Sequence, residues 1–484
     1  YALKVNTTGT QNTAIGYNGL AANTTGSQNV SLGYQALDSN TTANGNTGVG
    51  YQALTANTTG ASNTAVGAYC LDANDGDHNA AFGYNSMSEN TTGDNNTACG
   101  RSALANNTTG SQNTAVGRGA LDSNTTASNN TAVGYYALEA NTTADQNAAF
   151  GKSALAANTT GGNQTAIGFN ALAANTTGAA NTALGSSALA AATTANDNVA
   201  VGAGALQANE TGIYNVAVGR MALIASLASS NTAVGYKALE ADTTGNSNIA
   251  IGREALADNT TANNNLAIGY QALYVNTTTP NNVAVGNYSQ TANTGGSENT
   301  TVGYSAAQAN TTGSNLVAIG TWALNGNTTG QNNIALGRSA GDVTTTGSNN
   351  ITIGYGADPT GATESNEITL GTSTQDTLRC QVTSITSLSD ERDKTDIIDL
   401  PLGIDFLNTI RPVKFTWKHR EPVPSKDGTQ KAGFIAQELD KAQKDAGVKD
   451  YMKLVLDNNP DKLEASVGHL LPVLVKAVQE LSAQ

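Results

Sequence analysis

The stretch Asn130–Gln146 reads N-T-A-V-G-Y-Y-A-L-E-A-N-T-T-A-D-Q and is one copy of a unit that fills most of the chain. The glycine of its N-T-A-V-G string, here called the marker glycine, recurs 22 times between Gly16 and Gly371. Nineteen of the 21 intervals are 17 residues long, and the two that end at Gly83 and Gly235 are 16. Such a fixed period predicts a solenoid of stacked coils.

Each unit combines a strand pattern with a turn pattern. The T-A-V-G-Y stretch alternates small polar and β-branched residues, which is typical of a short strand. In N-T-T-G, asparagine bonds its own backbone and glycine accepts a positive φ, which is turn chemistry. Seventeen residues are too few for two helices. We therefore predict a mainly β protein, a parallel β-solenoid or β-roll over residues 1–371.

The apolar positions of the unit predict its interior. The residue before the marker glycine is apolar in all 22 copies, from Ile15 to Leu370, and leucine stands four residues after the glycine in 16 copies. One coil cannot bury these side chains alone, but stacked coils can. We expect the residue before the glycine to form a continuous interior column. At about 4.8 Å per coil, 22 coils predict a rod roughly 105 Å long. Because its core is thin, we expect several chains to share the rod.

Asparagine stands seven residues after the marker glycine in 16 of the first 21 units, from Asn23 to Asn327. In a secreted eukaryotic protein, the N-T-T strings would be glycosylation acceptors. The alternative is that identical side chains stack into hydrogen-bonded ladders between coils. The regular spacing favours the ladders.

The position after the marker glycine is tyrosine in nine copies and arginine or lysine in six. An exposed stripe of this kind would suit glycans or other surface polymers. The alternative, which we favour, is that rings and arginine stems stack along the rod. A flat threonine array that binds ice is a further alternative. The candidate ligand stripe comprises Tyr17, Tyr34, Tyr51, Tyr84, Arg101 and Arg118.

Composition excludes several classes of protein. A net charge of −14 and a pI near 4.6 argue against nucleic acid as a main partner. No apolar run approaches 18 residues, so no membrane span is predicted. Three cysteines make no disulfide framework, and we expect Cys70 and Cys99 in the core. The oxygen-rich loop Asn74–His78 lacks an EF-hand pattern, so a surface turn is favoured over a cation site. No metal or cofactor is expected.

The last part of the chain has a different composition. Charged residues number 28 in residues 1–371 and 32 in residues 372–484. We therefore predict three regions: the repeat shaft over residues 1–371, a linker or strand over 372–388, and a small α+β domain over 389–484 that ends in a helix.

Four strings follow one another in the last region. Ser389–Ile397 reads S-D-E-R-D-K-T-D-I, Pro412–Lys418 reads P-V-K-F-T-W-K, Gly433–Glu438 reads G-F-I-A-Q-E, and Leu470–Leu481 reads L-L-P-V-L-V-K-A-V-Q-E-L. Together they resemble the self-cleaving intramolecular chaperone of endosialidase tailspikes, which stands at the C-terminus of phage tail fibres. The N-T-A-V-G repeats are similar to the heads of trimeric autotransporter adhesins, which are trimeric left-handed β-rolls.

The first resemblance implies a trimer that cuts itself once at the Leu388–Ser389 bond, with Ser389 as nucleophile and Lys394 as base. Asp390, Arg392, Gln437 and Glu438 belong to the matching strings and are expected to support the site. None of the three histidines lies in a recognisable triad string, and a lysine serves as a base when desolvation lowers its pKa. The alternative role for Ser389 is that of a helix N-cap.

The terminal segment has apolar residues at helical spacing, and Pro472 fits only the first turn of a helix. Such a helix either forms a three-helix bundle or packs on its own domain. The stripe comprises Val467, Leu470, Leu471, Leu474, Ala477, Val478 and Leu481. The predicted local core comprises Phe406, Leu407, Ile410, Val413, Phe415, Trp417, Phe434 and Ile435.

Together with the repeats, the resemblance to the endosialidase chaperone implies a homotrimeric phage tail-fibre or tailspike-like shaft located in the virion, with a host-surface glycan or protein as receptor. Because Tyr1-Ala2-Leu3 matches the middle of a unit, we expect a preceding region that joins other tail or fibre proteins. The first alternative is a trimeric adhesin-like fibre on a bacterial surface. The second is a hydrolase that uses Ser389 in trans. The repeats hold few acids and no glycosidase-like pair, so the shaft itself is not expected to be an enzyme.

Overall fold

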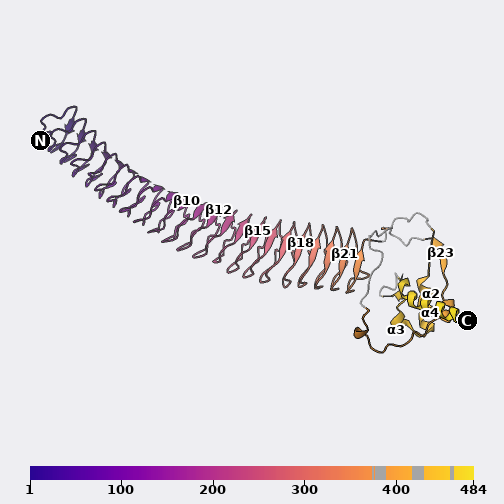
Figure 1. Cartoon of the computed structure of the whole chain (residues 1–484). Coiled ribbons are helices and arrows are strands. Elements are labelled where there is room, and N and C mark those ends of the chain that lie inside the picture. Colours follow the sequence, from indigo (N-terminus) through magenta and orange to yellow (C-terminus); the bar gives the residue numbers. More distant parts are fainter. Residues whose placement is uncertain (373–374, 376–388, 417–429, 458–462, 484) are drawn as a thin grey trace.

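The computed structural model describes all residues except 373–374, 376–388, 417–429, 458–462 and 484. The repeats form successive coils of a long, gently curved rod, with one three-residue strand in each coil (Figure 1). All 22 strands pair in parallel and in register, each with the strand of the next coil, as Thr114 does with Thr131. The predicted mainly β solenoid is confirmed.

The strands are β1 (Thr13–Ile15), β2 (Val30–Leu32), β3 (Thr47–Val49), β4 (Thr64–Val66), β5 (Ala80–Phe82), β6 (Thr97–Cys99), β7 (Thr114–Val116), β8 (Thr131–Val133), β9 (Ala148–Phe150), β10 (Thr165–Ile167), β11 (Thr182–Leu184), β12 (Val199–Val201), β13 (Val216–Val218), β14 (Thr232–Val234), β15 (Ile249–Ile251), β16 (Leu266–Ile268), β17 (Val283–Val285), β18 (Thr300–Val302), β19 (Val317–Ile319), β20 (Ile334–Leu336), β21 (Ile351–Ile353) and β22 (Ile368–Leu370).

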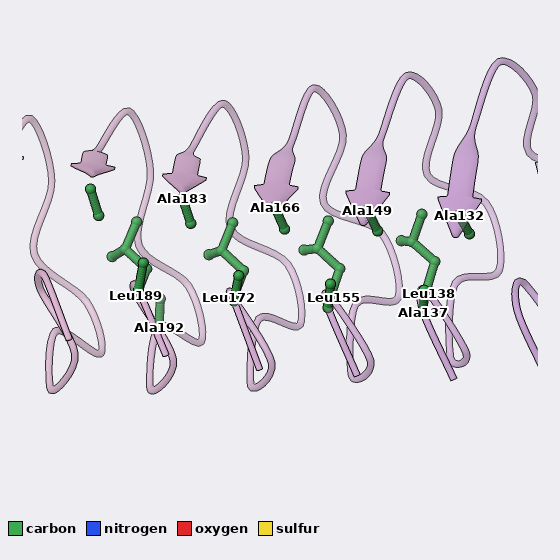
Figure 2. Packing of buried hydrophobic residues seen from close by; sticks show 14 of the residues in the cluster. Ala132, Ala137, Leu138, Ala149, Leu155, Ala166, Leu172, Ala183, Leu189 and Ala192 are labelled. Atoms are coloured by element: carbon green, nitrogen blue, oxygen red, sulfur yellow. The ribbon is translucent and has the colours of Figure 1, made fainter. Parts of the chain in front are cut away.

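The interior of the shaft is lined by the central residue of each strand and by the leucine four residues after the marker glycine. In Figure 2 the small side chains of strands such as Ala149 and Ala166 lie above a column that includes Leu155 and Leu172. Apart from Ala14 in the first coil, the central alanines and these leucines are fully buried. The shaft core is therefore a column of alternating small and large side chains, shared between neighbouring coils.

The expectation that the residue before the marker glycine lies inside is wrong. Leu32 is 45% exposed and Phe82 is 43% exposed, whereas the central residue between each pair of outer strand residues is buried. Successive side chains of a strand point to opposite faces. Because the alanine points inward, the first and last residues of the strand must both point outward.

Each leucine four residues after the marker glycine occupies a left-handed backbone conformation, as Leu138 does at φ 52°. This conformation costs an L-residue roughly 1–2 kcal/mol. Full burial of a leucine side chain contributes about 1.5–3 kcal/mol, which offsets that cost. The coil therefore keeps leucine where a turn would otherwise favour glycine or asparagine.

The marker glycine is required by the close stacking of coils. Gly33 has a φ of 148°, and a Cβ atom there would lie 2.1 Å from the carbonyl oxygen of Gly50 in the next coil. Any side chain would force the coils apart at this corner. The invariant glycine therefore reflects both backbone conformation and space.

The asparagines form the predicted ladders. Asn124 Nδ2 donates to Asn107 Oδ1 at 2.8 Å and to the carbonyl of Ala127 at 3.0 Å, and Asn141 Nδ2 donates to Asn124 Oδ1 at 3.0 Å. A second ladder runs through the asparagine that precedes most strands, where Asn113 Oδ1 accepts from the backbone N–H of Asn130 at 3.0 Å. These asparagines are buried, so the ladder interpretation is confirmed over the glycosylation one.

The C-terminal domain is a small α+β unit. Its elements are η1 (Glu391–Asp393), α1 (Ile404–Asn408), β23 (Val413–Thr416), β24 (Gln430–Gly433), α2 (Ala436–Asp445), α3 (Lys449–Met452), β25 (Val455–Leu456), β26 (Glu464–Ala465), η2 (Val467–Leu470) and α4 (Leu471–Ser482). β23 pairs with β24 and β25 with β26, both antiparallel. The final helix is confirmed.

The core of this domain only partly follows the prediction. Phe406 is buried in the core cluster of the domain, and Leu407, Ile410 and Phe434 pack against that cluster as predicted. Val413 and Phe415 are half-buried on β23, Ile435 is half-buried before α2, and Trp417 lies outside the described residues. The rest of the core comes from Leu402, Leu439, Val448, Met452, Leu454, Val455, Leu470 and Val473. Within the described part of the chain, no helix is long and apolar enough to cross a membrane.

Candidate functional site

The segment at the start of the C-terminal domain turns tightly around η1. Asp390 is the N-cap of this short helix, and its Oδ1 accepts from the backbone N–H of Arg392 at 2.9 Å. The same carboxylate pairs with the Arg392 guanidinium, which holds the pKa of Asp390 below its usual range. The alternative that Ser389 is the N-cap is therefore wrong, and the hydroxyl of Ser389 is available for another contact.

That contact is with Lys394. The turn brings Lys394 Nζ to 2.6 Å from Ser389 Oγ and to 3.2 Å from the carbonyl oxygen of Ser389. Five residues of chain are thus enough for the two side chains to meet, as the sequence predicted. A lysine in its amine form at this distance is placed to accept the hydroxyl proton and make the serine a nucleophile. Leu388, on the other side of the predicted scissile bond, lies outside the described residues.

An apolar hollow adjoins this pair. Lys394 lines it together with Ile397, Ile398, Leu400 and Tyr451. Ile398 is 81% exposed, and Ser389 and Lys394 are also exposed in the single chain. Ile397 and Ile398 were not predicted as site residues; two consecutive apolar residues in a charged stretch were the available signal.

Among the described residues, no hydrogen bond or ion pair is found between Gln437 or Glu438 and the Ser389–Lys394 pair. Both belong to the first turns of α2, and Glu438 forms an ion pair with Arg411 that keeps the pKa of its carboxyl below the usual range. This pair joins α2 to the segment before β23. The contact found for Glu438 is therefore one that holds α2 to the neighbouring segment, and its support of the serine–lysine pair stays a prediction.

The terminal helix packs on its own domain and still leaves an apolar face in solvent. Val473 and Ala477 are buried, and Glu480 Oε2 accepts from the backbone N–H of Ile404 at 2.8 Å. Pro472 lies in the first turn, as predicted. The exposed apolar residues of α4 are Leu471, Leu474, Val475, Val478 and Leu481. Their spacing of three and four residues is that of a helix-bundle seam.

The side chains of the candidate ligand stripe are stacked along the rod. The rings of Tyr17 and Tyr34 lie 5.2 Å apart at 12°, and those of Tyr34 and Tyr51 lie 5.1 Å apart at 6°. The guanidinium of Arg101 lies 5.8 Å from the ring centre of Tyr84. The Arg118 guanidinium lies 5.7 Å from the ring centre of the next tyrosine along the stripe. The stacking that we favoured is thus present, and ring faces turned toward neighbours are not open to sugars. Glycan binding by this stripe stays a prediction.

The acids of the shortened coil bond backbone amides. Asp75 Oδ1 accepts from the N–H groups of Thr58, Thr59 and Gly60 at 2.9, 2.7 and 3.1 Å. Partial burial raises the pKa of Asp75, but these bonds outweigh it and the pKa is lowered. The surface-turn interpretation of this loop is confirmed. Within the described residues, no three His, Cys, Asp or Glu side chains are grouped as metal ligands.

The two cysteines of the shaft differ in their exposure to solvent. Cys70 is buried, and burial raises the pKa of its thiol to about 12. Cys99 is exposed because it is the last residue of β6, which points outward. The expectation that both lie in the core is therefore wrong for Cys99.

A stacked-coil shaft followed by a small α+β domain with a serine–lysine pair at its start is the arrangement of a fibre-like protein with a C-terminal intramolecular chaperone. Residues 389–448 match the family model described as chaperone of endosialidase, a self-cleaving peptidase type of chaperone domain. The match begins at Ser389 and extends to Val448, just before α3, so the predicted resemblance is confirmed for this region. No curated protein and no solved structure matches the chain.

Proposed function

We propose that this chain is the shaft of a homotrimeric phage tail fibre or tailspike-like fibre, whose C-terminal domain brings three copies together and then cuts itself off at Leu388–Ser389. The observation that carries the cleavage step is the 2.6 Å contact between Lys394 Nζ and Ser389 Oγ. The matched family supports it, because it is a self-cleaving peptidase type of chaperone.

In the proposed reaction, the Lys394 amine takes the proton of Ser389 Oγ. The oxygen attacks the carbonyl carbon of Leu388, the carbon–nitrogen bond breaks, and the nitrogen of Ser389 receives the proton from the lysine ammonium. The product of this N-to-O shift is an ester between Leu388 and the Ser389 side chain. Water then hydrolyses the ester to the Leu388 carboxylate and the free hydroxyl. Each chain reacts once.

Assembly would switch this reaction on. An exposed lysine is protonated at neutral pH, and removal of water favours its neutral form. The apolar hollow formed by Ile397, Ile398 and Tyr451 adjoins Lys394, and α4 leaves a second apolar face in solvent. Neighbouring copies that cover these surfaces would desolvate the lysine. Cleavage would then follow assembly instead of preceding it.

The shaft explains why such a helper is needed. Every coil resembles every other. If one chain is displaced by one coil along another, most contacts between them are therefore replaced by contacts of the same kind. A domain with a single mode of assembly at one end would fix the register, and the coils would form from there. In the proposed virion, the released shaft reaches a host-surface glycan or protein, and a preceding region attaches it to other tail proteins.

The test compares freshly made protein with Ser389→Ala by intact mass and denaturing gel, with Ser466→Ala as a matched control in the same domain. Wild type and the control should split into pieces of 388 and 96 residues, and Ser389→Ala should stay whole. An uncut wild type that still forms trimers would show a chaperone without a protease step. Cleavage in Ser389→Ala would exclude the serine as nucleophile.

A further inference from the structure

The outward face of the shaft sheet carries an uninterrupted column of apolar side chains. The last residue of every strand is apolar and points away from the interior, from Ile15 to Leu370. Consecutive copies of this residue are neighbours in the parallel register, as Phe150 and Ile167 are. Isolated exposed apolar residues are ordinary, but a contiguous patch of this size marks an interaction site.

The same face carries no charge. Its 44 outward positions, two in each of 22 strands, hold only Thr, Val, Ile, Leu, Ala, Phe and Cys. All 28 charged residues of residues 1–371 stand at other positions of the coil. A sheet face in contact with water normally carries polar and charged side chains. Charge has thus been kept off this one surface of the rod.

The face has two zones, which differ in the first residue of the strand. In β1–β11 this residue is threonine in eight strands, alanine in two and valine in one. In β12–β22 it is valine, isoleucine or leucine in nine strands, and threonine only at Thr232 and Thr300. The half of the shaft nearer to the C-terminal domain in sequence therefore presents two aliphatic columns, and the other half presents one aliphatic and one mostly threonine column.

We propose that the outward face of β12–β22 is the main contact surface between copies of this chain. This inference rests on the proposed assembly of three copies and assigns the surface through which their shafts meet. The 11 strands offer 22 uncharged side chains, and a standard interface uses 20–30 residues on each side. Because every copy carries the same strand spacing, two such faces in register match along their whole length. The contact would begin beside the C-terminal domain and extend toward β1.

The first test places charges on the face in the full-length chain. Ile249→Lys with Ile251→Lys changes both outward residues of β15, and Thr114→Lys with Val116→Lys makes the matched change in β7. Ile251 and Val116 are equally exposed, at 38% and 37%. Native mass spectrometry of fresh protein should show at least a tenfold fall in the assembled fraction for the β15 variant and less than a threefold fall for the β7 variant. Circular dichroism checks that both variants keep their strands.

The second test locates the contact directly. A thiol introduced by Ile251→Cys is compared with one introduced by Thr261→Cys in the N-T-T turn of the same coil, in a background with Cys99→Ser and Cys380→Ser. In the assembled protein, the first thiol should react with maleimide at least tenfold more slowly than the second, and it should cross-link between chains under oxidation. If assembled protein shows equal reactivity at both thiols, the face is open to a glycan, a lipid surface or another protein, and the proposal fails. A wild type that stays a single chain would overturn both this inference and the three-copy part of the proposed function.

Discussion

The shaft and the C-terminal domain bury their side chains in opposite ways. In the shaft, buried side chains of one kind stack on copies of themselves, and buried asparagines are held by the asparagines of neighbouring coils, as Asn158 is by Asn175 at 2.7 Å. In the C-terminal domain, Gln443 is the one fully buried polar side chain among the described residues. Its Oε1 accepts from the backbone N–H of Leu454 at 2.8 Å, a contact that no other residue repeats.

The difference concerns information as much as stability. Exchange of one coil for the next leaves the ladders unchanged, so the shaft cannot specify its own register. The core around Phe406, Leu439 and Val473 joins helices and loops that occur once, so it permits a single arrangement. The shaft therefore supplies the length of the fibre, and the C-terminal domain supplies the register from which the coils stack. The following changes test each half of that division, from the largest expected effect to the smallest.

Lys394→Arg would disable the chemistry of the C-terminal domain without touching the shaft. Arginine keeps the charge but does not give up its proton at neutral pH, so it cannot act as the base. We expect self-cleavage to slow by about 10³-fold, within the range that a positioned base contributes. The half-life on a denaturing gel measures the effect. Lys441→Arg on the surface of α2 is the control, and unchanged cleavage in Lys394→Arg would refute the assigned role.

Gly151→Ala would break one coil of the shaft and leave the C-terminal domain intact. Gly151 has a φ of 135°, and a Cβ atom there would lie 2.5 Å from the carbonyl oxygen of Gly168. The strain and displacement should cost about 3 kcal/mol. Hydrogen exchange should show faster opening of the coils around this position. Gly162→Ala is the control, because its Cβ would come no closer than 3.1 Å to a neighbouring atom.

Asp242→Asn would repair an irregular position in the asparagine ladder. Burial raises the pKa of Asp242 from 3.8 to about 6, although Ser226 Oγ and Asn259 Nδ2 donate to its carboxylate at 2.9 and 2.8 Å. Between these pH values the folded chain holds a proton that the unfolded chain has lost, so stability falls as pH rises through 6.

The substitution should therefore stabilise these coils by about 2 kcal/mol at pH 7. Below about pH 3, where the carboxyl is protonated in both states, the gain should vanish. Thermal unfolding of the variant and the wild type at pH 7 and below about pH 3 checks the prediction. An equal gain under both conditions would show that charge is not the cause.

Ala192→Asn would fill a gap in the ladder. Ala192 is buried at the position that asparagine holds in most coils, and the buried Asn175 Oδ1 in the preceding coil lacks a hydrogen-bond partner within the described structure. The new amide should donate to this oxygen and stabilise the shaft by about 1 kcal/mol. Hydrogen exchange measures the change. Ala192→Leu is the control, since it adds volume without a donor, and an equal gain from it would contradict the hydrogen-bond explanation.

The architecture was predictable because a repeat multiplies weak local signals. The 17-residue period, the turn chemistry and the asparagine ladders all follow from positions such as Gly33 and Asn124, which recur in coil after coil. The direction of the strand residues was not foreseen. Size suggested that Val116 lies inside, whereas strand alternation turns Ala115 into the interior and Thr114 and Val116 away from it. The alternation of side chains along a strand was enough to predict these directions. The prediction instead gave more weight to the hydrophobicity of the residue before the glycine.

In the C-terminal domain, local patterns were informative and long-range packing was not. The approach of Lys394 to Ser389 needs only a short turn, so spacing was enough to anticipate it. Met452 and Leu454 join the core from a short helix and the segment that follows it, where no periodic pattern marks them. The predicted stripe of the last helix also joined buried and exposed positions, because Leu470 and Leu471 are adjacent in sequence although the first is buried and the second is exposed.

The marker glycine has a consequence for how such fibres vary in length. Because each coil meets the next through the same glycine corner, the same ladders and the same strand pairing, a coil can be duplicated or deleted without creating a new kind of contact. Genetic change by whole units of 17 residues would then alter reach in steps of about 4.8 Å while the cross-section stays constant. The two units of 16 residues, which end at Gly83 and Gly235, keep the glycine at this corner, so other changes of length fit the coil only where they leave the marker glycine in place.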